Sequence, residues 1–327
     1  MFENCKSIEE RMNKAERERA PFLFGFNFDL SEGFFVPNPL NQSDILFDIN
    51  GVGNSPTEQL QNSDFRFDIH PEPFERYKNK FDKVMRSLRS GDVKLVNLTI
   101  KTPITTSLGL KEIFRRSRAK YKLLVPDKFV CFSPECFVKV GNGKISSFPM
   151  KGTIDAHIPD AEWILLSNPK EIAEHEASVK QIEADLSQVA SSVQTKRFRY
   201  VERLDNHNGS LLQVSSEVEG ELMNKQSNRI GSILLSLLPA GSIAGVPKQE
   251  SLQIIREAEQ ESRGYYSGIF GYFDGVSLDT GVMIRFIEKD DDGKHFFRSG
   301  GGITANSDCE TEYSEAIAKI YLPIKPR

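Results

Sequence analysis

Lys151 is the residue whose neighbours in the sequence most clearly suggest chemistry. Residues 148–153 read Phe-Pro-Met-Lys-Gly-Thr, so the lysine follows apolar side chains and precedes Gly152, where a ligand can approach the backbone closely. An ammonium group held against an apolar surface can lose its proton near neutral pH and act as a nucleophile. The ordinary alternative is a solvated lysine at the end of a strand. Lys151 is therefore a candidate catalytic residue that needs a partner.

Glu135 is the candidate partner, because a hairpin would bring it close to Lys151. Two strand-like runs flank the Gly-Asn-Gly sequence at residues 141–143. A three-residue loop would place Glu135 opposite Pro149 and put Lys151 on the same face, about 7–8 Å away. A two-residue loop would reverse the parity and remove this argument. An acid beside an amine could act on one substrate, whereas the alternative is a surface salt bridge.

Carboxylates in two predicted helices suggest a site for a hard cation. Glu312, Glu315 and Lys319 fall on one face of the last helix by their spacing of three and four residues. Magnesium typically takes one or two protein carboxylates together with waters and substrate oxygens. Glu174, on the flank of an earlier long helix, is a candidate second ligand, whereas His175 projects into its apolar stripe as a core histidine would. The alternative for the last helix is a solvated Glu–Lys pair.

Two glycine-containing segments and one arginine suggest contacts with carboxylates. Residues 241–246 lead into a predicted helix that begins at Pro247, where free N–H groups and the helix dipole favour anions. Residues 300–302 are three glycines with bare backbone, and Arg285 could bind a carboxylate through two N–H groups. Tight turns are the alternative for both glycine segments. Together these features suit a substrate that carries more than one carboxylate.

The elements that would position these residues mix strands and helices without regular alternation. The hairpin strands are predicted over residues 130–140 and 144–150, and a further strand over 94–99. Helices are predicted over residues 1–20, 74–90, 109–118, from Asn168, over 217–238, from Pro247 and from Ser307 with a Ser307-x-x-Glu310 capping box. This mixture favours an α+β layered fold over a doubly wound sheet.

The composition excludes several classes of protein. The 327 residues are 39% hydrophobic and 27% charged with a net charge of -4, which is typical of a globular protein and argues against nucleic acid as a partner. The charged first 20 residues lack the apolar segment of a signal peptide, and the apolar run 233–246 is too short to span a bilayer. The four cysteines show no CxxC spacing, so neither a disulfide framework nor a zinc site is expected. We therefore predict a cytoplasmic protein with no membrane partner.

The motifs together resemble those of the chorismate-utilising enzymes, which include anthranilate synthase large subunits, aminodeoxychorismate synthase component I and isochorismate synthases. The similarity begins near residue 94 and extends to the C-terminus, and residues 1–90 resemble a shortened version of the family's N-terminal portion. The matching segments are Ser-Pro-Glu at 133–135, Pro-Met-Lys-Gly-Thr at 149–153, Ala-Glu-His at 173–175, residues 239–248, Gly-Ile-Phe-Gly-Tyr at 268–272, Gly-Gly-Gly-Ile at 300–303 and Glu-Tyr-Ser-Glu at 312–315. Each is modest alone, but their order and spacing together are specific.

The resemblance implies a four-layer α/β/β/α fold with two packed, mostly antiparallel sheets. Residues 1–327 would form a single chorismate-binding domain whose catalytic core is 91–327. The resemblance also implies that Glu174 and Glu315 hold Mg²⁺ and that Glu135 is the general acid. The positions implied to contact the substrate are Gly152, Thr153, Gly245, Tyr266, Arg285, Gly300, Gly302 and Lys319.

Lys151 also indicates which member of the family this chain resembles. Aminodeoxychorismate synthase component I carries a lysine at this motif position, whereas anthranilate and isochorismate synthases usually carry alanine. The water-adding members place a lysine base where this chain has Leu95, and alternation in a strand would point the adjacent Lys94 to the other face. The resemblance therefore implies amination of chorismate at C4 to 4-amino-4-deoxychorismate, for p-aminobenzoate and folate synthesis.

The expected ammonia source and two alternatives complete this prediction. No cysteine lies in a glutaminase-like context, so a separate glutamine amidotransferase subunit or free ammonium would supply ammonia. One alternative is anthranilate synthase component I. Another is a non-catalytic chorismate-binding subunit, because Gln213 replaces a histidine found in many relatives, and residues 180–184 interrupt the usual Asp-Leu-x-Arg-Asn-Asp pattern.

Overall fold

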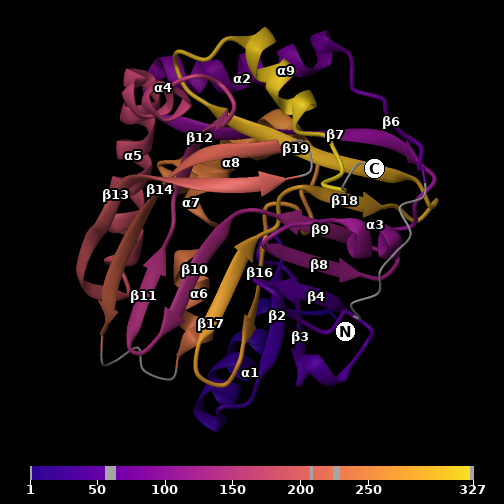
Figure 1. Ribbon diagram of the computed structural model, residues 1–327, viewed down its shortest axis with the longest axis vertical. Coiled ribbons are helices and arrows are strands. Elements are labelled where there is room, and N and C mark those ends of the chain that lie inside the picture. The colour runs from indigo at the N-terminus through magenta and orange to yellow at the C-terminus, as the bar shows by residue number, and fades with distance from the viewer. Residues whose placement is uncertain (1, 56–63, 207–208, 224–228, 325–327) are drawn as a thin grey trace.

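Two antiparallel β-sheets pack face to face, with helices on both outer sides (Figure 1). The computed structural model describes residues 2–55, 64–206, 209–223 and 229–324. Strand β2 (Phe22–Phe26) shows how the sequence specifies these layers, because its side chains alternate between two cores. Phe22, Phe24 and Phe26 face the outer helices, whereas Leu23 faces the other sheet. The predicted α/β/β/α fold is confirmed.

The first sheet contains ten strands. In spatial order they are β1 (Phe2–Glu3), β3 (Gly33–Pro37), β2, β16 (Ile269–Phe273), β17 (Leu278–Val282), β10 (Cys136–Gly141), β11 (Lys144–Ser147), β14 (Gly209–Leu222) and β12 (Met150–Asp155), with β13 (Ala190–Asn206) also paired to β14. The second sheet contains nine strands. They are β15 (Gly245–Val246), β7 (Leu95–Thr106), β19 (His295–Ile303), β18 (Phe286–Lys289), β9 (Phe129–Ser133), β8 (Tyr121–Val125), β4 (Leu46–Ile49) and β5 (Val52–Gly53), with β6 (Phe67–Ile69) paired to β7.

The helices divide between the two outer faces. Those packed on the first sheet are α1 (Cys5–Glu18), α4 (Ala161–Ser167), α5 (Pro169–Leu186) and α6 (Ile230–Leu237). Those associated with the second sheet are α2 (Phe74–Ser90), α3 (Leu110–Arg116), α7 (Gly241–Ala244), α8 (Lys248–Glu259) and α9 (Cys309–Ala318), and residues 39–41 form one 3₁₀ turn. In the view of Figure 1, α1 lies at the bottom of the molecule and α2 and α9 lie at the top. No helix in the described part of the chain is both long and apolar enough to cross a membrane.

Several local predictions agree with the structure. Helix α2 ends where Gly91 adopts a left-handed conformation with φ 85°, as the glycine at that position predicted. Helix α5 follows Asn168, whose side chain accepts a hydrogen bond from the backbone of Glu171, and its apolar stripe lies in the core. Turns at 274–277 and 290–294 connect the two later hairpins, β16–β17 and β18–β19.

Two predictions about helices were wrong. The helix predicted over residues 217–238 is confined to α6, because residues up to Leu222 belong to β14. There Glu217, Glu219 and Glu221 alternate with buried or half-buried small and apolar residues, which is the period of a strand. The cap of α9 is Asp308, whose carboxylate accepts from the backbone N–H of Thr311, rather than Ser307.

Candidate active site

Glu135 lies where the chain passes from one sheet to the other. The single strand predicted over residues 130–140 is two strands, with β9 in the second sheet and β10 in the first. Pro134 and Glu135 form the connection, and the Glu135 carbonyl accepts from the backbone N–H of Val282 at 3.1 Å. The glutamate is therefore fixed between the two sheets rather than carried on the surface of a hairpin.

The geometric argument that paired Glu135 with Lys151 was wrong, although both residues line one cavity. The β10–β11 loop has two residues, Asn142 and Gly143, both with positive φ, so Gly141 pairs with Lys144 and the parity is reversed. The predicted second strand also ends at Ser147. Lys151 belongs instead to β12, which pairs with β14, and this change of partner carries it back towards Glu135.

A β-bulge directs Lys151 towards the cavity. The register of β12 against β14 shifts between Lys151 and Thr153, and Gly152 at the bulge has φ 71°. A Cβ atom at Gly152 would lie 3.0 Å from Leu165 Cδ1 and 3.1 Å from Glu171 Oε2, so a larger residue is disfavoured by both conformation and space. The glycine after the lysine therefore shapes the strand at the candidate site.

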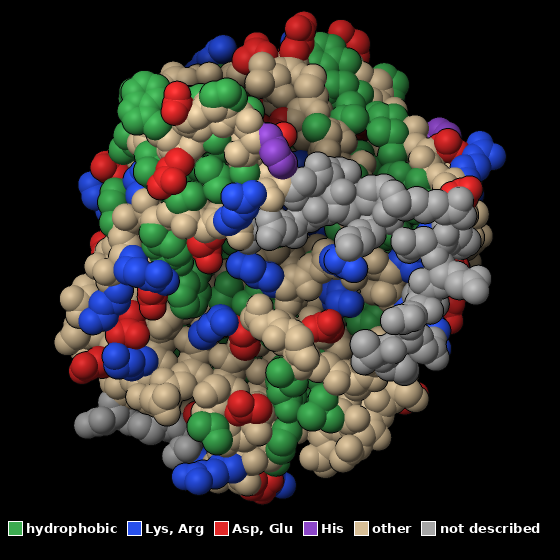
Figure 2. Space-filling view, in the orientation of Figure 1, with side chains coloured by type: hydrophobic (Ala, Val, Ile, Leu, Met, Phe, Trp, Pro, Cys, Tyr) green, Lys and Arg blue, Asp and Glu red, His purple; other side chains and the backbone are tan. Residues whose placement is uncertain are grey.

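Two adjoining chambers share Lys151, Glu174 and Gly302 in their walls. The larger has a volume of about 530 Å³, and its lining includes Glu135 and Ser242. The second has a volume of about 450 Å³ and is lined by Gly152, Glu315, Lys319 and other polar residues. Figure 2 shows a hollow near the middle of the face that carries α7 and β10, with Lys and Arg side chains around it. Chambers of this size suit a small organic substrate.

The environment of Glu135 favours its protonated form. Burial raises the pKa of the Glu135 carboxyl above its usual range, although Ser242, Lys151 and Arg285 each act in the opposite direction. Ser242 Oγ donates to Glu135 Oε1 at 2.7 Å. A carboxyl that keeps its proton towards neutral pH beside an amine can serve as a general acid.

Two further groups near Lys151 have buried nitrogen atoms without a hydrogen-bond partner. His175 on α5 is fully buried; its Nε2 lies 2.6 Å from Ser216 Oγ, whereas Nδ1 is unpaired. Burial, with smaller contributions from Arg199 and Lys151, lowers the pKa of His175 to about 4. Arg285 follows β17 with φ 51°, and its buried Nε also lacks a partner, which leaves a donor for a carboxylate near Glu135.

Glu174 and Glu315 reach the same chamber from α5 and α9. No three His, Cys, Asp or Glu side chains in the described ranges approach one another closely enough to form a metal site by themselves. Glu315 Oε1 instead lies 2.7 Å from Lys319 Nζ, which also donates to the Gly300 carbonyl at 3.0 Å. A pair of carboxylates across one chamber fits Mg²⁺, which completes its shell with waters and substrate oxygens.

Five of the predicted site residues do not contribute a described side chain or backbone to the chamber walls. They are Thr153, whose side chain lies outside the described atoms, and Gly245, Tyr266, Arg285 and Gly300. Gly245 instead pairs with β7, where a Cβ atom would lie 2.3 Å from the Leu95 carbonyl oxygen. Tyr266 is buried in the core between the sheets, and burial raises its pKa to about 12. Their contacts with substrate remain predictions.

Other lining residues were not singled out from the sequence, or were assigned to the wrong face. Ser242 lies in the glycine-containing segment that we expected to bind anions through its backbone, and its hydroxyl could not be assigned a partner without the fold. Lys94 lines the larger chamber beside Leu95, which contradicts the prediction that it points away. It precedes the first residue of β7, so strand alternation does not apply to it. Lys180, from the interrupted motif, lines the same chamber.

Comparisons with known proteins agree with this fold and identify the family. Residues 37–325 match the chorismate binding enzyme family. A PabA-like protein of Haemophilus influenzae is 46% identical over 317 residues, which cover 97% of this chain and 96% of that protein. A solved structure described as a 2,3-dihydroxybenzoate-specific isochorismate synthase, DhbC, from Bacillus anthracis has a TM-score of 0.74 at 21% identity, covering 98% of this chain and 88% of its own.

Two relatives with named reactions are similar to about the same degree. Anthranilate synthase component 1 of Acetivibrio thermocellus is 32% identical over 259 residues, and aminodeoxychorismate synthase component 1 of Escherichia coli is 30% identical over 262. These matches cover 74% and 75% of this chain but only 51% and 56% of the relatives, so the chain spans about half of their length. Identity alone does not choose between the two reactions. The match to the family over residues 37–325 and the 46% identity to a relative of nearly the same extent show that the chain belongs to the family of chorismate binding enzymes.

Proposed function

We propose that this protein aminates chorismate at C4 to give 4-amino-4-deoxychorismate, the reaction of aminodeoxychorismate synthase component I. The observation that carries the proposal is that Lys151, on the β12 bulge, lines both chambers while Glu135 lines the larger one. Members of the family that this chain resembles carry a lysine at this position when they perform this reaction. A lysine and a protonated carboxyl at one substrate provide a nucleophile and an acid.

The first step is a displacement by the lysine. Neutral Lys151 Nζ forms a bond to ring carbon C2 and becomes a secondary ammonium, both ring double bonds shift, and the C4–O bond breaks. Glu135 gives its proton to the departing hydroxyl, which leaves as water. The raised pKa of Glu135 supports this role, because the carboxyl then holds a proton at a pH where an ordinary glutamate has lost it. The Lys151 ammonium must lose one proton before it attacks.

The second step reverses the first with a different nucleophile. Ammonia forms a bond to C4, both ring double bonds shift back, and the bond between C2 and the Lys151 ammonium breaks, so the lysine leaves as a neutral amine. The new ammonium at C4 then gives a proton to the Glu135 carboxylate. The enzyme is restored, and no pyruvate is released. We infer that ammonia comes from a glutamine amidotransferase partner or from free ammonium, and that a separate lyase completes p-aminobenzoate.

Glu174 and Glu315 are the residues that we propose hold Mg²⁺. The bound cation would neutralise and orient the substrate's ring carboxylate. Lys319 and the backbone at Gly302, on the walls of the same chamber, would position the substrate beside it. These contacts would place the ring between Lys151 and Glu135.

Water addition at C2, which gives isochorismate, is a second candidate because Lys94 lines the larger chamber. One experiment distinguishes amination at C4 from the other candidate functions. The protein is incubated with chorismate, Mg²⁺ and ammonium, with and without an aminodeoxychorismate lyase, and the products are identified by mass spectrometry. We expect aminodeoxychorismate alone, converted to p-aminobenzoate only when lyase is added. Anthranilate without lyase, isochorismate as the main product, or binding of chorismate without turnover would each overturn the proposal.

A further inference from the structure

A third cavity lies farther along the strands that contribute to the candidate active site. It has a volume of about 660 Å³ and is lined by α2, the end of α8, and residues of β7 and β19. Lys101 and Pro103 of β7 and Phe296 of β19 form part of its wall, several residues away from Leu95 and Gly302 at the chambers described above. None of its lining residues also lines those chambers. We call this cavity the α2–α8 groove.

Helix α2 presents a cationic stripe to this groove. Arg76, Asn79, Lys80 and Lys83 recur at the spacing of one helical face, and all four line the groove. The opposite face of the same helix is buried in the core through a separate set of residues, Tyr77, Phe81, Val84, Met85 and Leu88. The cationic stripe is therefore not needed to attach α2 to the molecule.

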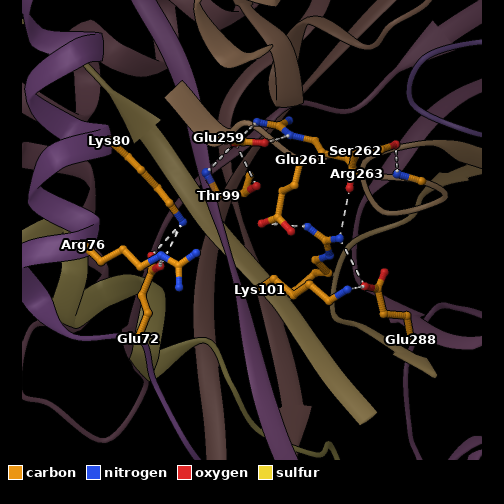
Figure 3. Close-up of polar contacts among 12 residues, drawn as sticks. Glu72, Arg76, Lys80, Thr99, Lys101, Glu259, Glu261, Ser262, Arg263 and Glu288 are labelled. Carbon is orange, nitrogen blue, oxygen red and sulfur yellow. Dashed lines mark hydrogen bonds and ion pairs between the residues drawn. The ribbon is translucent and has the colours of Figure 1, made fainter. Parts of the chain in front are cut away.

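The carboxylates in and beside the groove each contact a cation (Figure 3), and they are fewer than the cations. Glu72 serves two of them, with Lys80 Nζ at 2.9 Å and Arg76 Nε at 3.5 Å. Lys83 Nζ donates only to the Glu257 backbone carbonyl, at 3.1 Å. We counted the charged Lys, Arg, Asp and Glu side chains that line the groove in the described part of the chain, and those that form ion pairs with them. Six are cationic: Arg76, Lys80, Lys83, Lys101, Arg263 and Arg298. Four are anionic: Glu72, Glu259, Glu261 and Glu288.

The surplus is located at Arg76 and Lys83. Lys101 is paired with Glu288 at 2.7 Å, and Arg263 is paired with Glu259 at 2.6 Å, so these cations are already neutralised in the wall. Arg76 is 75% exposed and shares its carboxylate with Lys80. Arg76 and Lys83 lie seven residues apart, or about 10 Å along the helix, so their long side chains can approach one ligand from two sides.

Apolar side chains form another part of the groove wall, beside its polar residues. Pro71, Pro73, Pro103 and Phe296 line it, and the Lys101 ammonium lies 4.2 Å from the centre of the Phe296 ring. Apolar walls beside cations that outnumber the nearby carboxylates suit a ligand that has an apolar body and an anionic group, rather than a bare inorganic ion. We propose that the α2–α8 groove binds a small organic anion, with its carboxylate or phosphate at Arg76 and Lys83 and its apolar body against Phe296.

Binding can be tested without any assumption about the reaction. Benzoate, as an organic carboxylate, and inorganic phosphate are each titrated into the protein by isothermal calorimetry at low ionic strength. Benzoate is expected to bind, and the double variant Arg76→Gln/Lys83→Gln is expected to weaken its affinity by about tenfold or more, because two charge-assisted hydrogen bonds are removed. The matched control is Lys78→Gln/Arg89→Gln, which removes two cations from the same helix outside the groove.

The outcomes separate this groove from the chorismate site. Benzoate affinity in the control variant should stay within about twofold of the wild type, and saturating chorismate with Mg²⁺ should not displace the probe. Absence of benzoate binding, binding of phosphate alone, equal weakening in both double variants, or displacement by chorismate would overturn the proposal. Because the readout is binding, a different catalytic reaction would leave this result intact.

Discussion

Glu135 is half-buried and Glu259 is buried, and the hydrogen-bond partners of their carboxylates distinguish a candidate chemical role from a supporting one. The Glu259 carboxylate accepts four hydrogen bonds, two from Arg263 at 2.6 and 2.9 Å and two from Thr99 at 2.9 Å. Glu135 accepts one described side-chain hydrogen bond, from Ser242, and its pKa is raised by burial. A carboxylate with every position filled holds structure together, whereas one with few partners can exchange a proton.

The two regions meet in the short helix α7. Ser242 donates to Glu135, and the carbonyl of the next residue, Ile243, accepts from Arg263 at 2.9 Å. Arg263 also donates to the Asn97 carbonyl of β7 at 2.7 Å. The Glu259–Arg263 pair therefore holds the backbone of α7, which carries the Ser242 hydroxyl that donates to Glu135. We infer that the Glu259–Arg263 pair positions the candidate site without taking part in its chemistry.

Loss of the nucleophile should have the largest effect on the Glu135 region. Lys151→Ala and Lys151→Arg should each lower amination on the order of 10³-fold or more, because neither side chain can form the bond to C2 near neutral pH. Steady-state kinetics measures the loss, and chorismate binding by calorimetry should persist in the alanine variant. The control is Lys144→Ala, a strand lysine paired with Glu219 outside the chambers. Full activity in Lys151→Ala would mean that ammonia attacks C4 directly.

Removing the acid should produce a smaller loss and a change in pH dependence. Glu135→Gln is expected to lower the rate about 10²-fold. In the wild type the raised pKa keeps the carboxyl protonated to higher pH than usual, so the rate should fall as pH rises through that value. The glutamine variant should lack this descending limb. If the descending part of the pH–rate profile remains in Glu135→Gln, it reports another titrating group, and Glu135 is not the general acid.

Breaking the saturated pair should act mainly on stability. Arg263→Met leaves the Glu259 carboxylate buried without its cation, and should lower the free energy of unfolding by about 3–5 kcal/mol. The double variant Glu259→Gln/Arg263→Met removes both charges and should recover part of that loss. Denaturant unfolding of the three proteins measures both effects. Equal stability of Arg263→Met and the wild type would contradict the support role.

The smallest effect is expected at the contact between the two regions. Ser242→Ala removes a hydrogen bond that lowers the pKa of Glu135, so the descending limb should move to higher pH by about 1 pH unit or less. The control is Ser236→Ala, whose hydroxyl bonds only within α6. The pH–rate profile of each variant is the measurement. An unchanged limb in Ser242→Ala would show that this hydroxyl does not tune Glu135.

The sequence predicted the layers better than the connections at the site. Helical periodicity depends on local side chains, and it correctly predicted α2 and α5. The relation of Glu135 to Lys151 depends on which strands pair, and a loop one residue shorter than expected reversed the parity. Long-range pairing also accounts for the positions of Ser242 and Lys94, because β15, which follows Ser242, pairs with the start of β7, which follows Lys94. The pairing of β12 with β14 likewise brings Lys151 to the chambers. Local patterns carry no information about such partners.

The proposed mechanism depends most directly on a covalent bond between Lys151 and the substrate ring. Intact-protein mass spectrometry can test this directly, with the protein quenched in acid after incubation with chorismate and Mg²⁺ in the absence of ammonia. We predict a protein species heavier by chorismate less one water, located at Lys151 by peptide mapping, lost on addition of ammonium and absent from Lys151→Ala. Aminodeoxychorismate formation on addition of ammonium, with no such adduct at any quench time, would contradict the account.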